Sequence, residues 1–438
     1  MSLKLLLVAD SDSQLLACQA LAHCADEHRV RVTVNAVPRE GTPAAVLETL
    51  QRIGPLWRQS LRQLLADPRL DDFDAIGVYL TGSKLAEFRS VYLTSRRQHG
   101  QPPRPLFCGF NGVVLQGFEE AIAWRLGYDL ICLNGPRDQA RLEWMLRHTP
   151  FAGQRCVLTG LARQRGEHRP AATERASRLV FAEQVVMPAD QAERRRMVRI
   201  LAALARRSPD WEVLIKPRVA PHENTFHAVD THISQTLTET LGSPPANLRL
   251  SYEPLAALLR DSRLLATVSS TAVFDAIDLG CRPVVMADFG LRQDLGTPFF
   301  AGSGLLHRLE QAADLDSLAT GPDPDPDWLE WVGYHPRFSP DNLLEALQML
   351  AGRPERPEPV LHHPGYVINA AELASNQLRR GAEAAIRRGD RDEAVRLLEI
   401  AQLQRPDNRN IARRLAAVRL PNPIARRLAL LVTPGFRP

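Results

Sequence analysis

The stretch "LLATVSSTAVFDAIDLGCRPVVM", residues 264–286, carries the signals of a strand, a helix and a second strand. An apolar run ends in Ser269, Ser270 and Thr271, a helical pattern follows, and a second apolar run begins after Gly280. Two apolar runs joined by a helix are typical of parallel strands in an α/β domain. The stretch therefore predicts a parallel sheet in which three hydroxyl side chains lie where a buried strand meets a helix.

Outside this stretch, strand and helix signals alternate through two long parts of the chain. Runs such as "LKLLLVAD", "VRVTVNAV" and "DAIGVYL" predict a Rossmann-like domain over residues 1–165. The polar and basic stretch "LARQRGEHRPAATERAS" predicts a linker. Runs such as "RLVFAEQVVM", "EVLIKPR" and "RPVVMAD" predict a second Rossmann-like domain over residues 175–350. Because open α/β sheets bind ligands at the carboxyl ends of their strands, we expect the two domains to face a cleft.

The last part of the chain differs from the rest in composition and in pattern. Residues 351–372 are rich in proline and predict an extended linker, and residues 373–438 predict an α-helical tail. The spacing of a tetratricopeptide repeat is carried by Ala382, Ala385, Gly389, Ala394, Leu398, Ala401 and Pro406. A generic pair of helices is the alternative. One repeat cannot bury its own apolar face, so we expect the tail to pack on the rest of the protein or on another subunit.

The end of the tail, "IARRLAAVRLPNPIARRLALLVTPGF", alternates apolar residues with arginines. Two interpretations fit this pattern: a helix on an anionic membrane surface, and a helix that packs on the protein with a solvated basic face. The tail is thus a candidate for peripheral membrane contact or for binding a protein partner.

The composition excludes several classes of protein. Of the 438 residues, 45% are apolar and 24% are charged, as in ordinary globular proteins. No apolar run approaches the roughly 18 residues that span a bilayer, and the N-terminus reads as a first strand, not as a signal peptide. The six cysteines are scattered without a CxxC pair, which is typical of reduced thiols. We expect a cytoplasmic protein, either free or peripheral at the inner face of the membrane.

Neither a nucleic-acid partner nor a cofactor is indicated. The net charge of +4 is small, and the sequence has no basic stripe with interleaved aromatic residues. His222, His227 and His232 are five residues apart, which is a poor spacing for a metal site. The sequence also lacks the motifs of dinucleotide-binding, P-loop, zinc-protease and α/β-hydrolase sites. We therefore expect no metal and no other cofactor.

The three hydroxyls at the predicted helix start favour an anion site. Free backbone N–H groups and the helix dipole attract a phosphate, and Ser269, Ser270 and Thr271 add hydroxyl donors. The alternative is an ordinary N-cap, for which serine and threonine are well suited. Asp275 follows one helical turn later, where a carboxylate would accept ribose hydroxyls. Its alternative role is that of a solvated acid near the helix N-terminus.

Cations end a neighbouring predicted strand. Lys216 and Arg218 terminate "EVLIKPR", where they would face a ligand at the strand ends. Lysine is rare in this arginine-rich chain, being present only at Lys4, Lys84 and Lys216, so each lysine stands out. Two surface charges without a ligand are the alternative.

Further candidate binding residues come from two other stretches. Glu223 and His227 lie in the loop that follows "EVLIKPR". Glu183 and Gln184 are polar residues inside the apolar run "VFAEQVVM", where burial without partners is costly. We therefore expect Glu183 and Gln184 to face the cleft.

The first predicted strand ends in two acids. Asp10 and Asp12 of "VADSDSQ" lie where this strand meets its helix. An acid at this place would deprotonate a hydroxyl of a substrate, and a helix cap is the alternative. We take Asp10 and Asp12 as the candidate catalytic residues.

Together these motifs resemble a bacterial family of glycosyltransferases. The resemblance covers about residues 1–310 and is carried by "VADSDSQL", "LVFAEQVVMPADQAER", "VLIKPR" with "ENTFH", and "TVSSTAVFDAIDLGCRPVVMADFG" through "FAGSGLL". More distantly, the arrangement is similar to bacterial sialyl-, polysialyl- and Kdo-transferases of GT-B fold. In those enzymes a basic-Pro motif and a Ser/Thr cluster hold a CMP-sugar. Those transferases commonly carry His-Pro at the place where this chain has Lys216, Pro217 and Arg218.

The resemblance implies a metal-independent, inverting GT-B enzyme. Its donor would be a CMP-sugar carrying a nonulosonic acid or Kdo, and its acceptor a surface glycan, a lipid-linked molecule or a protein. The helix dipole, the hydroxyls and the cations would stabilise the departing phosphate, and an acid of the first domain would activate the acceptor. The alternative is a non-catalytic or epimerase-like two-domain protein that binds a sugar nucleotide, with a protein partner on its repeat.

Overall fold

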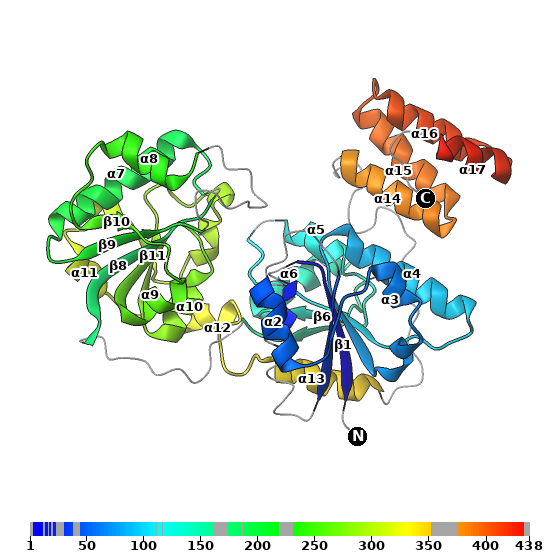
Figure 1. Cartoon of the computed structure of the whole chain (residues 1–438), viewed down its shortest axis with the longest axis horizontal. Coiled ribbons are helices and arrows are strands. Elements are labelled where there is room, and N and C mark those ends of the chain that lie inside the picture. The colour runs from blue at the N-terminus through cyan, green and yellow to red at the C-terminus, as the bar shows by residue number, and fades with distance from the viewer. Residues whose placement is uncertain are drawn as a thin grey trace. The chain divides into compact units, whose positions relative to one another are not determined.

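The protein forms two compact units that are divided differently from the sequence prediction (Figure 1). The computed structural model describes residues 3–11, 14–15, 17–18, 21–22, 30–37, 44–110, 112–115, 117–149, 151–161, 174–185, 187–218, 231–351 and 375–432. Unit 1 comprises Met1–Asn111, Gly117–Gly160 and Pro336–Pro438, and unit 2 comprises Gly112–Gln116 and Leu161–His335. The predicted linkers, "LARQRGEHRPAATERAS" and residues 351–372, lie largely outside the described residues.

Unit 1 contains a parallel sheet, sheet A, with the strand order β3-β2-β1-β4-β5-β6-β7. Its strands are β1 (Lys4–Ala9), β2 (Arg31–Ala36), β3 (Leu56–Trp57), β4 (Ala75–Tyr79), β5 (Leu106–Cys108), β6 (Leu130–Leu133) and β7 (Cys156–Leu158). The helices described around it are α2 (Ala44–Ile53), α3 (Leu61–Leu65), η1 (Pro68–Asp72), α4 (Ser83–Gln98), α5 (Phe118–Ala123), α6 (Pro136–Leu146) and α13 (Pro340–Ala351). The predicted Rossmann-like domain is confirmed.

Helix α13 belongs to unit 1, although the sequence analysis placed it at the end of the second domain. Its apolar face packs into the core beneath sheet A. The Asn342 side-chain amide donates a hydrogen bond to the carbonyl of Leu158 at 2.8 Å. The predicted boundary at residue 350 is therefore wrong, because unit 2 ends at His335. Helical periodicity shows which face is apolar but not which sheet that face covers.

Unit 2 contains a second parallel sheet, sheet B, with the strand order β10-β9-β8-β11-β12-β13. Its strands are β8 (Ala176–Ala182), β9 (Glu212–Lys216), β10 (Leu248–Leu250), β11 (Ser262–Thr267), β12 (Arg282–Met286) and β13 (Leu306–His307). The helices described in this unit are α7 (Gln191–Arg207), α8 (Ile233–Leu241), α9 (Leu255–Asp261), α10 (Ala272–Leu279), η3 (Gln293–Leu295), η4 (Thr297–Phe300), η5 (Leu309–Gln311), α11 (Leu315–Ala319) and α12 (Pro326–Trp331). Two Rossmann-like α/β units are thus present as predicted, and a cleft between them stays a prediction.

An aromatic cluster fixes helix α10 in unit 2. The ring of Phe274 stacks on Trp328 and Tyr334, with centroid distances of 6.0 and 5.5 Å. The Tyr334 hydroxyl donates to the buried carboxylate of Asp278 at 2.5 Å. Residues 112–115 pack against the same cluster, which explains why this short segment belongs to unit 2. The start of α10 is therefore held in place by its packing against this aromatic cluster.

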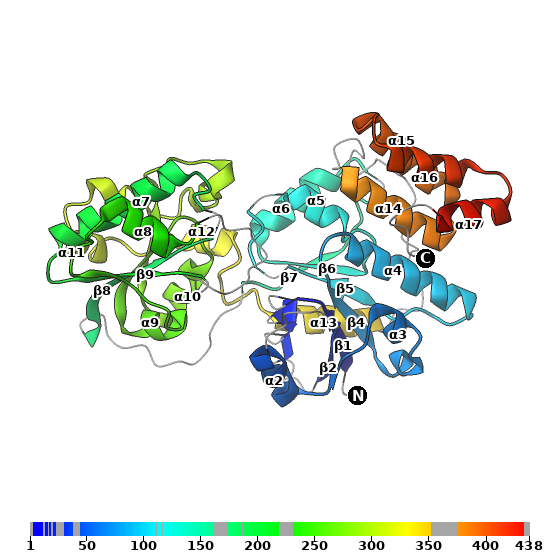
Figure 2. The same cartoon turned by 45° about the horizontal axis from the view of Figure 1, so that its top comes forward.

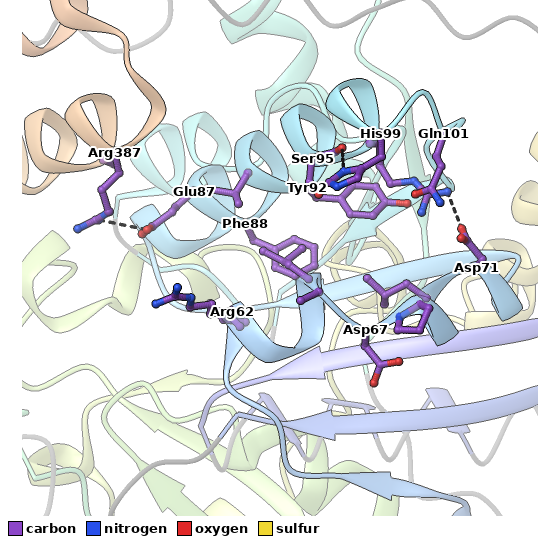
Figure 3. Close-up of a pocket in the computed structure, with 18 residues that line it drawn as sticks. Arg62, Asp67, Asp71, Glu87, Phe88, Tyr92, Ser95, His99, Gln101 and Arg387 are labelled. Carbon is purple, nitrogen blue, oxygen red and sulfur yellow. Dashed lines mark hydrogen bonds and ion pairs between the residues drawn. The ribbon is translucent and has the colours of Figure 1, made fainter. Parts of the chain in front are cut away.

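The tail is helical, as predicted, and packs on unit 1. It contains α14 (Ser375–Arg388), α15 (Arg391–Gln404), α16 (Arg409–Arg419) and α17 (Pro423–Leu431). Alanines of α14 and α15 are buried where the two helices meet. Helix α14 lies beside α4 (Figure 2). Arg387 of α14 pairs with Glu87 of α4 at 3.1 Å (Figure 3). The likeness to a tetratricopeptide repeat stays a prediction.

The docked tail closes a pocket of about 670 Å³ between α3, α4 and α14 (Figure 3). The pocket is lined by the aromatic side chains of Phe88 and Tyr92, and Asp71 and Arg96 pair at its rim at 2.5 Å. None of its lining residues directly follows a strand of sheet A, so the pocket is not at the carboxyl ends of these strands. No helix in the described ranges is long and apolar enough to cross a membrane.

Gly77 is required at the centre of sheet A by packing. A Cβ there would lie 2.4 Å from the Phe107 ring and 2.7 Å from the Leu7 side chain. We therefore expect Gly77→Ala to destabilise unit 1 by about 1–3 kcal/mol, as overpacked cores do. The matched control is Gly153→Ala, since a Cβ at Gly153 meets no atom within 4 Å. Thermal unfolding of both variants tests this, and equal melting temperatures would show that the core adapts freely.

Candidate functional site

The carboxyl edge of sheet B contains a topological switch point. Strands β8 and β11 are neighbours, and the chain continues from β8 to β9 on one side and from β11 to β12 on the other. Two connections that leave in opposite directions make a crevice at the strand ends, which is where open α/β sheets bind ligands. The residues that follow β8, β9 and β11 therefore form the candidate site of unit 2.

Gln184 joins the ends of β8 and β11. The side-chain oxygen Oε1 of Gln184 accepts hydrogen bonds from the backbone N–H of Ser269 at 2.9 Å and from the Thr267 hydroxyl at 3.3 Å. Its amide nitrogen donates to the Ser269 hydroxyl at 3.4 Å. The side chain that the sequence marked as a binding candidate is thus engaged in holding the strand ends together.

The three hydroxyls that follow β11 have different surroundings. Ser269 is 1% exposed, and its hydroxyl donates to the sulfur of Met187 at 3.2 Å. Ser270 is half-buried and accepts from the backbone N–H of Ala272 at 3.2 Å. Thr271 is exposed, and its side chain makes no capping hydrogen bond. Ser269 is therefore structural, whereas Thr271 and part of Ser270 remain accessible at the start of α10.

Two cations end β9 on the other side of β8. Lys216 is in register with Ala182, is half-buried, and donates to the Pro217 carbonyl at 2.6 Å. Arg218 is exposed, and no partner of its guanidinium is found among the described residues. Its backbone N–H donates to Glu183 at 3.3 Å. The edge of sheet B thus carries positive charge.

Glu183 is buried, whereas the sequence analysis expected it to face the cleft. Its carboxylate is buried and pairs at 2.7 Å with Arg194, which is also buried. Arg194 also donates to the carbonyl of Val185 at 3.1 Å, within the turn that follows β8. A buried carboxylate is tolerated when it is paired and hydrogen-bonded. Glu183 is therefore part of the support of this edge, and its charge is balanced by Arg194.

Asp275 lacks such a partner. It is half-buried in the first turn of α10, and no hydrogen bond or ion pair of its carboxylate is found in the part of the chain that the structure describes. Burial, and then the nearby charge of Asp278, raise the pKa of Asp275 above its ordinary value. Perturbed carboxyl groups of this kind occur preferentially at functional sites.

Three predicted site residues, Asp12, Glu223 and His227, lie outside the described residues. Within the described ranges, no group of three His, Cys, Asp or Glu side chains has the arrangement of metal ligands. The expectation of a metal-free site stays a prediction.

Sheet A has its own switch point, between β1 and β4. Asp10, which follows β1, accepts at one carboxylate oxygen from Thr81 at 3.2 Å and at the other from Lys84 at 2.5 Å. Gln14 accepts from the backbone N–H of Asp10 and donates to Thr81, both at 3.1 Å. The Asp10 side chain is 2% exposed and that of Lys84 is 50% exposed. The ammonium group of Lys84 is thus half-exposed, whereas its counter-ion, the carboxylate of Asp10, is buried.

The sequence analysis missed two members of these sites. Lys84 was notable only because lysine is rare, and nothing in the sequence connected it to Asp10, 74 positions away. Arg194 is one of many arginines in its helix, and its burial beside Glu183 depends on the turn that follows β8.

The sequence from residue 5 to residue 350 matches a family described as "Putative glycosyltransferase (DUF6716)". This match covers most of the chain, and the protein therefore belongs to this family and to the glycosyltransferase class of enzymes. Helices α14 to α17 lie outside the matched part. No curated protein matches the sequence.

Solved structures with a similar fold share little sequence with this chain. The co-structure of MnaA from S. aureus with UDP has a TM-score of 0.50 at 13% identity, covering 82% of this chain and 99% of that one. A UDP-N-acetylglucosamine 2-epimerase has a TM-score of 0.49 at 15% identity, covering 82% and 99%. MurG from Acinetobacter baumannii has a TM-score of 0.44 at 12% identity, covering 79% and 99%. The fold is of the GT-B type, with two parallel-sheet α/β domains.

Asp275 should lower the stability of the folded protein at neutral pH. Its folded-state pKa is raised, so ionisation disfavours the folded state above that pKa, and the penalty disappears as the pH falls below the ordinary value. We therefore expect Asp275→Asn to raise the melting temperature at neutral pH and to lose this advantage in acid. Thermal unfolding over a pH series tests it.

The matched control is Asp294→Asn. The pKa of Asp294 is lowered because Arg292 donates hydrogen bonds to it, so its neutralisation should not stabilise the protein at neutral pH. If Asp275→Asn melts at or below the parent temperature at neutral pH, its carboxylate is not under electrostatic strain.

Proposed function

We propose that the protein transfers a sugar from a nucleotide-sugar donor held at the carboxyl edge of sheet B. The observation that carries this proposal is that two cations, Lys216 and Arg218, and the accessible hydroxyls at the start of α10 all follow strands at the same edge of sheet B. A donor phosphate needs positive charge and hydrogen-bond donors at one place. The buried pair of Glu183 and Arg194 supports the proposal because the charge of this carboxylate is already balanced by Arg194.

In this proposal each residue of the edge has its own role. Thr271 and Ser270 donate to phosphate oxygens, and Lys216 and Arg218 balance their charge, so that no metal is required for departure of the nucleotide. Asp275 accepts the ribose hydroxyls, a role that suits a carboxylate without hydrogen bonds to described residues. Gln184 keeps the strand ends in place for these contacts. Glu223 and His227 remain proposed donor contacts on the sequence alone.

We propose a CMP-sugar carrying a nonulosonic acid or Kdo as the donor, on the resemblance to bacterial sialyl- and Kdo-transferases. A UDP-sugar is the second candidate, because MnaA from S. aureus, which has a similar fold, is described in complex with UDP. The acceptor is proposed to be a glycan, a lipid-linked molecule or a protein. An inverting displacement follows if a base of the protein activates that acceptor.

On the acceptor side, we propose that Asp10 acts together with Lys84. In this proposal Lys84, which pairs with Asp10, turns toward the acceptor, and Asp10 then receives the proton of the acceptor hydroxyl. The half-exposed side chain of Lys84 has room for this movement. Asp12 stays the second candidate for the base.

Donor binding tests the proposal. A thermal-shift panel of CMP, UDP and GDP identifies the nucleotide, and calorimetry in the presence of a chelator then measures its affinity. Each charged hydrogen bond is worth about 1.5–3 kcal/mol, so Thr271→Val, Ser270→Ala and Lys216→Ala should each weaken binding roughly tenfold or more. Lys216→Arg should restore binding only in part, because the two cations differ in shape.

Thr320→Val is the matched control, since Thr320 is an exposed threonine at the end of α11. It should bind the nucleotide like the parent. If Thr271→Val and Lys216→Ala also bind like the parent, the edge of sheet B is not the donor site. Loss of binding in the chelator, with rescue by Mg²⁺ or Mn²⁺, would contradict the metal-independent proposal.

Asp10 should affect turnover and not donor affinity. Removing a general base typically costs about a hundredfold or more in rate, so Asp10→Asn should lower kcat of sugar transfer by this order while the nucleotide binds as before. Lys84→Ala should act in the same direction. Lys4→Ala, at the exposed opposite end of β1, is the control. A loss of nucleotide affinity in Asp10→Asn as large as that in Lys216→Ala would contradict the division of roles.

A further inference from the structure

Helix α17 exposes an apolar stripe. Ile424 is 71% exposed, Leu428 60%, Leu431 53% and Val432 81%. These positions are spaced by four, three and one residues, and therefore lie on one face of the helix. Leu430, on another face, is buried in the core of the tail. A continuous row of large apolar side chains in solvent marks an interaction site and not an ordinary surface.

The same part of the chain is strictly basic. The last acidic residue of the sequence is Asp407. The residues that follow it include the arginines Arg409, Arg413, Arg414, Arg419, Arg426, Arg427 and Arg437. Arg409, Arg413 and Arg427 are exposed. The described sequence after Asp407 therefore carries no acidic side chain, although Arg414 and Arg419 pair with Glu383 and Glu399 of neighbouring helices of the tail.

A hollow of about 440 Å³ adjoins the stripe. Arg387, Arg391, Arg426 and Arg427 line it together with Leu431, and no carboxylate is among its lining residues. Arg391 donates to backbone carbonyls of α16, and Arg426 donates to the carbonyl that ends α16, at 3.3 Å. Arg387 pairs with an acid of α4 at 3.1 Å. Leu431 belongs both to the hollow and to the stripe, so the two features are continuous.

We propose that α17 and this hollow form a docking surface for an anionic lipid bilayer. Apolar side chains on one face of a basic helix insert at the boundary of headgroups and acyl chains, while arginines contact lipid phosphates. The hollow then receives a phosphate-bearing headgroup beside the inserted Leu431. This surface lies in the tail, so it is independent of the donor site at sheet B.

The charge argues for a bilayer over a second copy of the chain. In a twofold contact the same patch faces itself, so the arginines beside the stripe would meet arginines. An anionic lipid surface offers apolar depth and negative charge together. The sequence pattern left a helix packed on the protein as the alternative, and the exposure of four apolar residues on α17 contradicts full packing of this face.

Vesicle sedimentation of the full-length protein tests the proposal. The protein should sediment with vesicles of phosphatidylcholine mixed with phosphatidylglycerol at low salt, less at high salt, and little with phosphatidylcholine alone. Arg427→Gln should lower the partition coefficient about fivefold, and Leu428→Glu about tenfold or more. Arg195→Gln on α7 and Met349→Glu on α13, which alter exposed residues of other helices, are the matched controls.

Three results would overturn the proposal: no retention of the parent by anionic vesicles, equal retention by neutral ones, or parent-like binding of Leu428→Glu. Light scattering supplies a fourth test. A dimer of the parent that dissociates in Leu428→Glu would show that a second copy covers the stripe. Thermal unfolding of each variant confirms that the exposed substitutions leave the fold intact. Calorimetry with the nucleotide separates this outcome from failure of the donor site, because Leu428→Glu should bind the nucleotide normally.

Discussion

The hydrogen bonds of Gln184 are the interaction on which the site of unit 2 depends. One side-chain amide satisfies the backbone N–H of Ser269 and the hydroxyls of Thr267 and Ser269, at the only place where β8 and β11 both end. Without it, the buried backbone N–H of Ser269 would lose the hydrogen bond that it makes to this side chain, which is costly. The position of Ser269 in turn fixes where α10 begins. The accessible hydroxyls of Ser270 and Thr271 follow from that start.

Each sheet has a buried carboxylate at its switch point, but the two carboxylates have different cationic partners. In unit 1 the buried carboxylate of Asp10 pairs with a half-exposed lysine, so the edge of sheet A offers a nearly neutral pair. In unit 2 the buried carboxylate of Glu183 pairs with buried Arg194, and exposed Arg218 adds positive charge at the same edge. A neutral pair suits a hydroxyl group, and an edge with excess cations suits a phosphate. This difference is the physical basis for assigning the acceptor to unit 1 and the donor to unit 2 in the proposed reaction.

Local signals predicted much of this fold, and long-range packing accounts for the rest. The apolar runs predicted the longer strands because a buried parallel strand reads as a continuous apolar segment. The two-residue strands β3 and β13 escaped notice because two residues carry no period. The sequence analysis assigned residues 336–350 to the second domain, because no local pattern shows that helix α13 packs in unit 1. The polarity of Gln184 within an apolar run was informative, whereas its partners, more than 80 positions away, were not predictable from local pattern.

Asp275 differs from the buried carboxylates at the ends of β1 and β8. Asp10 and Glu183 each have a cationic partner, which is the usual condition for a carboxylate removed from water. Asp275 is half-buried beside Asp278, and its pKa is raised because nothing in the described chain offsets that burial. An asparagine would fill the same space without the charge. A carboxylate that weakens the fold at neutral pH persists where it gains a partner in the bound state, and donor hydroxyls supply such a partner. The cost in stability at Asp275 and the proposed contact with the ribose are therefore two consequences of one arrangement.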